Sequence, residues 1–200
     1  MSLSEKRGVF GVVANPQSYL NILYLLLSFP LGTIYFVFLV TGVSLGLGMI
    51  ITLFGIPILL LVLGGSLVLC DFERMVATAM LKEHIPPASS QPTSGGWWPR
   101  LKARLINRVT WTGMLYLLLK FPVGTATFTI AVTLVSVTGA LLAAPIYYSF
   151  VDMNWSVWTI DTLWEAFLLT LIGIPMLFIS LHLMNGAAFV SGRLARAMLT

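Results

Sequence analysis

Charge is scarce in this sequence. Lys, Arg, Asp and Glu make up 9% of its 200 residues, whereas typical soluble domains contain about 25%. No charged residue occurs from Gly8 to Cys70, from Phe121 to Val151, or from Ala166 to Gly192. A helix needs about 20 apolar residues to cross the hydrocarbon core, so the first stretch suffices for two crossings and each of the others for one. The sequence therefore predicts an all-α integral membrane protein with four transmembrane helices.

Other chemistry-bearing features are missing as well. Cys70 is the single cysteine, which excludes an internal disulfide and a cysteine-rich metal site. The sequence has no metal-ligand spacing of His, Cys, Asp and Glu, no glycine-rich phosphate loop and no nucleophile motif. We therefore expect a protein that is not an enzyme, with no catalytic residue, no cofactor and no metal. The apolar stretches are continuous rather than alternating, which argues against a β-barrel.

One stretch of the chain is present twice. Residues 24–33 read YLLLSFPLGT, and residues 116–125, which lie 92 positions later, read YLLLKFPVGT. A second block reads TLFGIP at 52–57 and TLIGIP at 170–175, an offset of 118. The larger offset places 26 additional residues in the second half. We interpret the chain as two tandem helical hairpins in the same orientation, a parallel internal repeat.

The repeat divides the chain into three parts. Residues 1–84 form the first hairpin, with helices at about 19–42 and from about 47 to beyond 70, joined by a glycine-rich outer turn at 41–48 and continued by a cytosolic helical extension at 71–82. Residues 85–108 are a Pro/Ser/Gly-rich linker followed by a basic segment. Residues 109–200 form the second hairpin, with helices at about 110–141 and 163–190 and an inserted outer loop at about 144–162. The first helix is expected to be capped by Ser18.

Prolines and glycines occupy matching positions in the two halves. A proline inside a helix removes a backbone donor and kinks the helix unless neighbouring groups restore the bond. A sharper break at Pro30, with residues 19–29 lying along the membrane surface, is the alternative. The predicted hinge residues are Pro30, Gly32, Pro57, Pro122, Gly124 and Pro175.

The distribution of Lys and Arg predicts the orientation. These residues precede the first helix, lie between the second and third, and follow the fourth, while the two opposite loops contain none. Both termini and the central linker are therefore predicted to be cytosolic. Lys120 is expected to extend its ammonium group to the cytosolic face. Because the net charge of +4 comes from these flanks, no nucleic-acid partner is expected. The predicted lipid-interface residues are Trp97, Trp98, Arg100, Lys102 and Arg104.

Candidate ligand-binding residues gather in the outer loop, which the first half lacks. Aromatic rings offer apolar contact, and carboxylates could hold a cation. An aromatic belt at the outer interface is the alternative. His182 joins this set because ionisable residues inside membrane segments are functional candidates, although a neutral histidine can also bond across helices. The candidates are Tyr147, Tyr148, Asp152, Trp155, Trp158, Asp161, Glu165 and His182.

Several of these motifs resemble the sensor domain family of prokaryotic, mainly actinobacterial and archaeal, membrane histidine kinases. The motifs are LLLSFPLG at 25–32, GIP at 55–57, YLLLKFPVG at 116–124 and RLARA at 193–197. The resemblance implies a sensor module that passes an extracytoplasmic or bilayer stimulus to a cytosolic partner in a two-component system. The chain has no phosphoacceptor histidine region and no ATP-binding motif. It is thus expected to be either part of a kinase or a stand-alone relative that acts through a partner.

Membrane lipids and a histidine kinase or other cytosolic signalling protein are the expected partners, and a second copy of the chain is a candidate for a homodimer. Two other functions stay open. A small transporter or channel subunit would place polar residues along an interior path. A lipid-binding membrane assembly factor would use the basic tryptophan segment to hold lipid.

Overall fold

Four long α-helices make up most of the described structure. The computed structural model describes residues 13, 15–81, 107–148, 154–155, 158–159 and 162–199. The helices in this part of the chain are α1 (Pro16–Gly48), α2 (Gly55–Leu81), α4 (Arg108–Tyr147) and α5 (Leu163–Leu199). Each is long and apolar enough to cross a membrane. The predicted all-α class with four such helices is confirmed.

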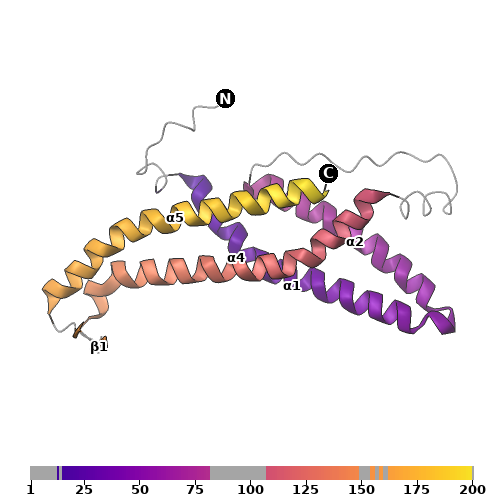
Figure 1. The fold of residues 1–200 in the computed structure, drawn as a ribbon, viewed down its shortest axis with the longest axis horizontal. Helices are drawn as coiled ribbons and strands as arrows, with labels where there is room; N and C mark the ends of the chain where they lie inside the picture. The colour runs from indigo at the N-terminus through magenta and orange to yellow at the C-terminus, as the bar shows by residue number, and fades with distance from the viewer. Residues whose placement is uncertain are drawn as a thin grey trace, which may run out of the picture.

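The helices form two hairpins that cross. α1 pairs with α2 and α4 pairs with α5, and Figure 1 shows the two hairpin tips at opposite ends of the long axis. The most extensive contact between helices is that of α1 with α4, the first helix of each hairpin. The starts of α1 and α4 and the ends of α2 and α5 lie toward the upper edge of Figure 1, whereas both tips lie toward the lower edge.

Each hairpin begins at an asparagine cap. The side chain of Asn15 accepts a hydrogen bond from the backbone N–H of Gln17 at 3.1 Å, and Asn107 accepts one from Val109 at 3.0 Å. Both residues satisfy N–H groups that have no partner within the helix. The predicted cap at Ser18 is therefore wrong. Ser18 lies buried inside α1 instead.

The tip of the first hairpin lies further along the chain than predicted. Residues 41–48 belong to α1, and the turn runs through a short 3-10 helix, η3 (Ile50–Thr52), to Leu53, whose φ is 63°. The glycines of the predicted turn bring the two helices together. A Cβ on Gly46 would lie 2.6 Å from Cδ2 of Leu59 on α2, so a larger residue would require the Leu59 side chain to move.

Internal prolines do not interrupt the helices. Pro30, Pro122 and Pro175 each lie inside a continuous helix. The alternative of a break at Pro30 is therefore wrong. α4 changes direction part way along its length (Figure 1). Pro57 lies in the first turn of α2 rather than inside it, at a position where proline removes no intrahelical hydrogen bond.

The inserted region is shorter than predicted and contains a small ladder. α4 extends to Tyr147, and the antiparallel strands β1 (Asn154–Trp155) and β2 (Trp158–Thr159) pair Trp155 with Trp158. α5 begins at Leu163 as expected and continues to Leu199, beyond the predicted end.

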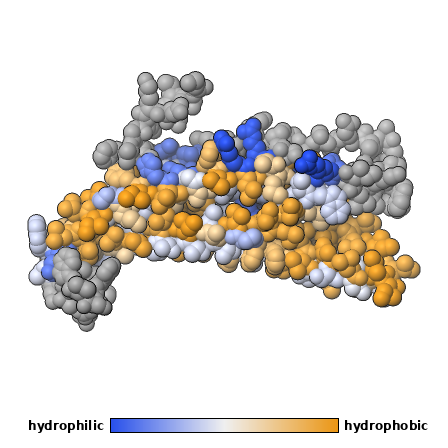
Figure 2. Space-filling model, in the orientation of Figure 1, coloured by the Kyte–Doolittle hydropathy of each residue, from blue (hydrophilic) through white to orange (hydrophobic). Residues whose placement is uncertain are grey.

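The outer surface is strongly apolar. Figure 2 shows apolar residues over most of the visible face, with hydrophilic residues gathered along the edge where the helices begin and end. Ile51 is 90% exposed, Ile146 76% and Trp164 71%. Because such large apolar surfaces are unfavourable in water, the structure is that of a multi-pass membrane protein.

Candidate functional site

The crossing of α1 and α4 depends on two glycines. A Cβ on Gly32 would lie 2.7 Å from the carbonyl oxygen of Lys120, and a Cβ on Gly124 would collide with the carbonyl oxygen of Ser28. Small residues of this kind allow helix backbones to approach closely. The two contacts are related by the 92-residue offset, since Ser28 corresponds to Lys120 and Gly32 to Gly124.

Two stacked phenylalanine pairs flank the crossing. The ring centroids of Phe29 and Phe128 are 5.1 Å apart, and those of Phe36 and Phe121 are 4.7 Å apart. The same offset relates Phe29 to Phe121 and Phe36 to Phe128. The crossing is thus built from equivalent residues of the doubled stretch, which contact each other reciprocally.

A buried ion pair lies beside this crossing. The ammonium nitrogen of Lys120, on α4, is 2.6 Å from Oε1 of Glu73, on α2. Lys120 is 3% exposed and Glu73 is 0% exposed. Because α2 and α4 belong to different hairpins, this pair connects the two halves of the molecule through its interior.

Three tyrosine hydroxyl groups complete the hydrogen bonding of Glu73. Tyr24 and Tyr116 each donate to Oε1 at 3.0 Å, and Tyr35 donates to Oε2 at 3.1 Å. All three tyrosines are buried. A carboxylate has about four acceptor positions, and the tyrosines and Lys120 together supply four donors. Three of these donors bond to Oε1 and one to Oε2, so both oxygens of the carboxylate are hydrogen-bonded inside the bundle.

Lys120 has a second partner in the same cluster. Its ammonium nitrogen donates to the hydroxyl oxygen of Tyr24 at 2.6 Å and lies 4.3 Å from the centroid of the Tyr24 ring. Tyr24 therefore accepts from Lys120 and donates to Glu73. We refer to Tyr24, Tyr35, Glu73, Tyr116 and Lys120 as the charge cluster.

The burial of Lys120 corrects one prediction. Its ammonium group does not extend to the cytosolic face, because a carboxylate and a phenol lie within hydrogen-bonding distance inside the bundle. The predicted helical extension after Cys70 is part of α2, but it is packed into the core, with Glu73 and Ala77 both buried.

Sequence reasoning missed the charge cluster, although one signal was present. Lys120 is a charged residue at the position that Ser28 occupies in the first copy of an otherwise apolar stretch. Charges inside membrane segments usually have a nearby partner. The identity of that partner depends on how α2 packs against α4, which the spacing of residues does not show.

Arg74, the neighbour of Glu73, holds the end of α5. Its Nε and Nη2 atoms donate to the carbonyl oxygen of Leu199 at 3.1 Å and 2.6 Å, and its Nη1 pairs with Asp71. The last carbonyl groups of a helix have no intrahelical donor, so Arg74 supplies one. Two adjacent residues of α2 therefore contact α4 and α5.

His182 lies apart from the charge cluster. It is exposed on α5, and its Nδ1 lies 2.8 Å from the carbonyl oxygen of Phe178. The residue that bonds across helices is Asn185, one turn further on. Asn185 accepts from Asn21 at 2.9 Å and donates to Ser18 at 3.2 Å, which joins α5 to α1.

Three candidates of the outer loop have structural contacts. The Tyr147 hydroxyl donates to the carbonyl oxygen of Ala140 at 2.7 Å, and Tyr148 packs beside the second hairpin tip. Glu165 accepts from the Thr162 N–H at 3.1 Å and from its hydroxyl at 2.8 Å, a capping box that begins α5.

The remaining candidates lie partly or wholly outside the described residues. Only the backbone is described for Trp155 and Trp158. Among the residues that the structure describes, no group of three or more His, Cys, Asp and Glu could hold a metal ion. The candidates outside the description are Asp152, Asp161, Trp97, Trp98, Arg100, Lys102 and Arg104.

The fold and the charge cluster define a class of protein: a helical multi-pass membrane protein whose two hairpins are joined by a buried ion pair. Within that class the family is known, because the family model described as Putative sensor matches residues 24–199. The match covers most of the chain, which therefore belongs to this family, as the sequence motifs predicted. Comparison with curated proteins and with solved structures found no match.

Proposed function

We propose that this protein is a membrane-embedded sensor module that passes a stimulus from the extracytoplasmic side or the bilayer to a cytosolic partner. Family membership supports a sensor role in general. The observation that carries the proposal is the buried pair of Glu73 and Lys120 between the two hairpins. Ionisable groups in membrane segments are costly to bury and usually mark a functional element.

The charge cluster suits a two-state element. A stimulus can shift a protein between two arrangements only if it interacts differently with each. Separation of Lys120 from Glu73 would leave two buried charges without their main partner, so intermediate positions are disfavoured. A change in the packing of the hairpins would therefore proceed between two discrete arrangements rather than gradually.

The route from the cluster to the cytosolic side is short. Glu73 bonds to α4, and the adjacent Arg74 bonds to the last turn of α5. Any displacement of this part of α2 would thus move the carbonyl oxygen of Leu199 or break its bonds. The predicted hinges at Gly32 and Gly124 lie at the crossing, about which the hairpins would rotate.

The proposed orientation places both termini and the linker in the cytosol of a prokaryotic cell. Its support is that the helix ends lie along one edge of the molecule, where hydrophilic residues also gather (Figures 1 and 2). The outer loop would then face outward as the receiver. The proposed partner is a histidine kinase or another cytosolic signalling protein, and a homodimer is a further candidate.

A channel or small transporter is the second candidate, because buried polar side chains do lie between the helices. In the charge cluster, however, both oxygens of Glu73 are already hydrogen-bonded to Lys120 or tyrosine hydroxyl groups, so a passing ion would have to compete with these partners. Ion flux through liposomes that contain the purified protein would support this candidate.

The proposal can be tested by the phosphorylation of the host's two-component response regulators. The phosphorylation of these regulators should differ between cells that lack the protein and wild-type cells. Cells with the double variant Glu73→Gln/Lys120→Met should show the same phosphorylation as cells without the protein, although the variant is present in the membrane in the same amount as the wild-type protein. Thr129→Val is the matched control, because Thr129 lies exposed on α4 and donates to the carbonyl oxygen of Thr125 in its own helix, and it should behave as wild type. Equal phosphorylation with and without the protein would contradict a sensor role.

A further inference from the structure

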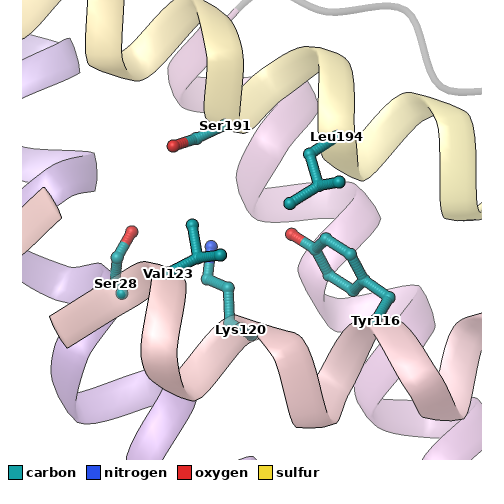
Figure 3. Close-up of a pocket in the computed structure, with 7 residues that line it drawn as sticks. Ser28, Tyr116, Lys120, Val123, Ser191 and Leu194 are labelled. Atoms are coloured by element: carbon teal, nitrogen blue, oxygen red, sulfur yellow. The ribbon is translucent and has the colours of Figure 1, made fainter. Parts of the chain in front are cut away.

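A small cavity adjoins the charge cluster. Its volume is about 10 Å³, and it is lined by Ser28 of α1, Lys120 of α4 and Ser191 of α5, among others. Figure 3 shows the side chains of these residues directed toward the same space between the helices. A volume of about 10–15 Å³ on this measure corresponds to one water molecule.

The two serines present acceptors to this cavity rather than donors. The Ser28 hydroxyl donates to the carbonyl oxygen of Tyr24 at 2.8 Å, and the Ser191 hydroxyl donates to that of Ala187 at 2.9 Å. Each hydroxyl group has one proton and two lone pairs. Because both protons are already used within their own helices, the lone pairs remain to accept hydrogen bonds.

Lys120 has one proton more than the cluster uses. An ammonium group carries three protons, and the structure assigns two of them to Glu73 and Tyr24. A buried donor that lacks an acceptor destabilises the fold, and more so when it is charged. A molecule that accepts one bond and donates two would satisfy Lys120 and both serines together.

We infer that this cavity is a binding site for one ordered water molecule. The water accepts from Lys120 and donates to Ser28 and Ser191, which gives it three hydrogen bonds, the usual number for a buried water. It extends the polar contacts of Lys120, which already bonds to Tyr24 of α1, to Ser28 of the same helix and to α5. The charge cluster and this water together then join all four helices.

The doubled sequence explains why space exists at this point. Ser28 corresponds to Lys120 at the offset of 92, and Ser191 corresponds to Glu73 at the offset of 118. One side of the crossing therefore holds two long charged side chains that meet directly. The related positions on the other side hold two short hydroxyl side chains, and a water molecule fills the difference in length.

A structure of the full chain in lipid nanodiscs, at a resolution that shows ordered water, tests the inference directly. We expect a density peak within hydrogen-bonding distance of Lys120 Nζ, Ser28 Oγ and Ser191 Oγ. A cavity without density would overturn the inference. Direct contact between the ammonium group and either serine oxygen would overturn it as well.

Thermal unfolding in detergent provides a second test. Ser191→Ala should lower the midpoint by roughly 2–4 °C more than Ser66→Ala. Ser66 is the matched control, since it is equally a buried serine bonded to its own helix, at 2.8 Å from the carbonyl oxygen of Leu63. In the Glu73→Gln/Lys120→Met background the excess should vanish, because the water has lost its donor. The same excess in both backgrounds, or none in either, would refute a water bound to Lys120. Neither outcome depends on signalling activity.

Discussion

Lys120 and Glu73 illustrate how much a single contact can decide inside a membrane protein. Two charges have been removed from water, and the cost of their burial is offset by the attraction between them together with hydrogen bonds from three tyrosine hydroxyl groups to Glu73. A buried pair of this kind is weak evidence of stability in itself. We therefore propose a role in switching for the pair, rather than a role in stability alone.

Removal of one charge should be far more harmful than removal of both. Lys120→Met leaves Glu73 buried and unpaired, and we expect a loss of about 3–5 kcal/mol in the free energy of unfolding. Glu73→Gln/Lys120→Met removes both charges and keeps an amide oxygen for the tyrosines, so it should recover most of that loss. The free energy of unfolding of both variants can be measured in detergent by following the circular dichroism signal of the helices.

Arg193→Met is a suitable control for this series. The Arg193 guanidinium lies over the ring of Phe189 at 4.6 Å on the exposed side of α5, so its loss should change stability by less than about 1 kcal/mol. If the double variant were as unstable as Lys120→Met, the charge on Glu73 would not be the cause of the instability.

At the contact of α1 with α4, sequence reasoning identified the two glycines but not their role. The glycines at 32 and 124 were predicted to be hinges beside prolines. The structure shows that each faces a backbone carbonyl group of the other helix. Their need for space, rather than their flexibility, explains why glycine occurs at both positions.

Gly124→Ala should therefore weaken the crossing. The new methyl group would collide with the carbonyl oxygen of Ser28, which can move only if α1 moves with it. We expect a loss of roughly 1–3 kcal/mol, as in other overpacked cores. Gly139→Ala, on the same helix with no atom within 4 Å of the new methyl group, should be neutral or slightly stabilising. Equal unfolding midpoints for the two variants would argue against close backbone contact at the crossing.

Helix ends were predicted less well than helices. The three uncharged stretches, the first of them long enough for two crossings, predict four helices because the cost of unpaired backbone groups in lipid leaves few alternatives. Glycine-rich residues 41–48 suggested a turn because glycine is unfavourable within helices in water. In α1 this local preference is outweighed by packing against α2, which only the small residues allow.

On the scale of the whole molecule, the two hairpins cross in the middle and diverge toward separate tips (Figure 1). A small rotation at the crossing would therefore produce a larger displacement at Ile51 and Ile146, which lie near the two tips and are exposed. This geometry makes the distance between the tips a sensitive report of the state of the charge cluster.

Spin labels at positions 51 and 146, introduced as cysteines with Cys70→Ala, should show this displacement. In Glu73→Gln/Lys120→Met we expect the distance distribution between the labels to shift or broaden, measured by pulsed electron paramagnetic resonance. Labels at Val37 and Leu61, exposed on the two helices of one hairpin, should keep their distance. Equal broadening of both pairs would indicate general loosening of the fold instead of rotation about the crossing.

The sequence by itself determined the membrane class, the four helices, the sensor family and the doubled stretch, because apolar length and motif spacing are properties of the chain read locally. Only the tertiary structure decided that Lys120 meets Glu73, that three tyrosines surround the carboxylate, and that glycines serve contact between helices. Those relations arise where α1 crosses α4 and α2 packs beside them. The energy of a buried charge depends on which groups lie around it, and residues distant in sequence supply those groups.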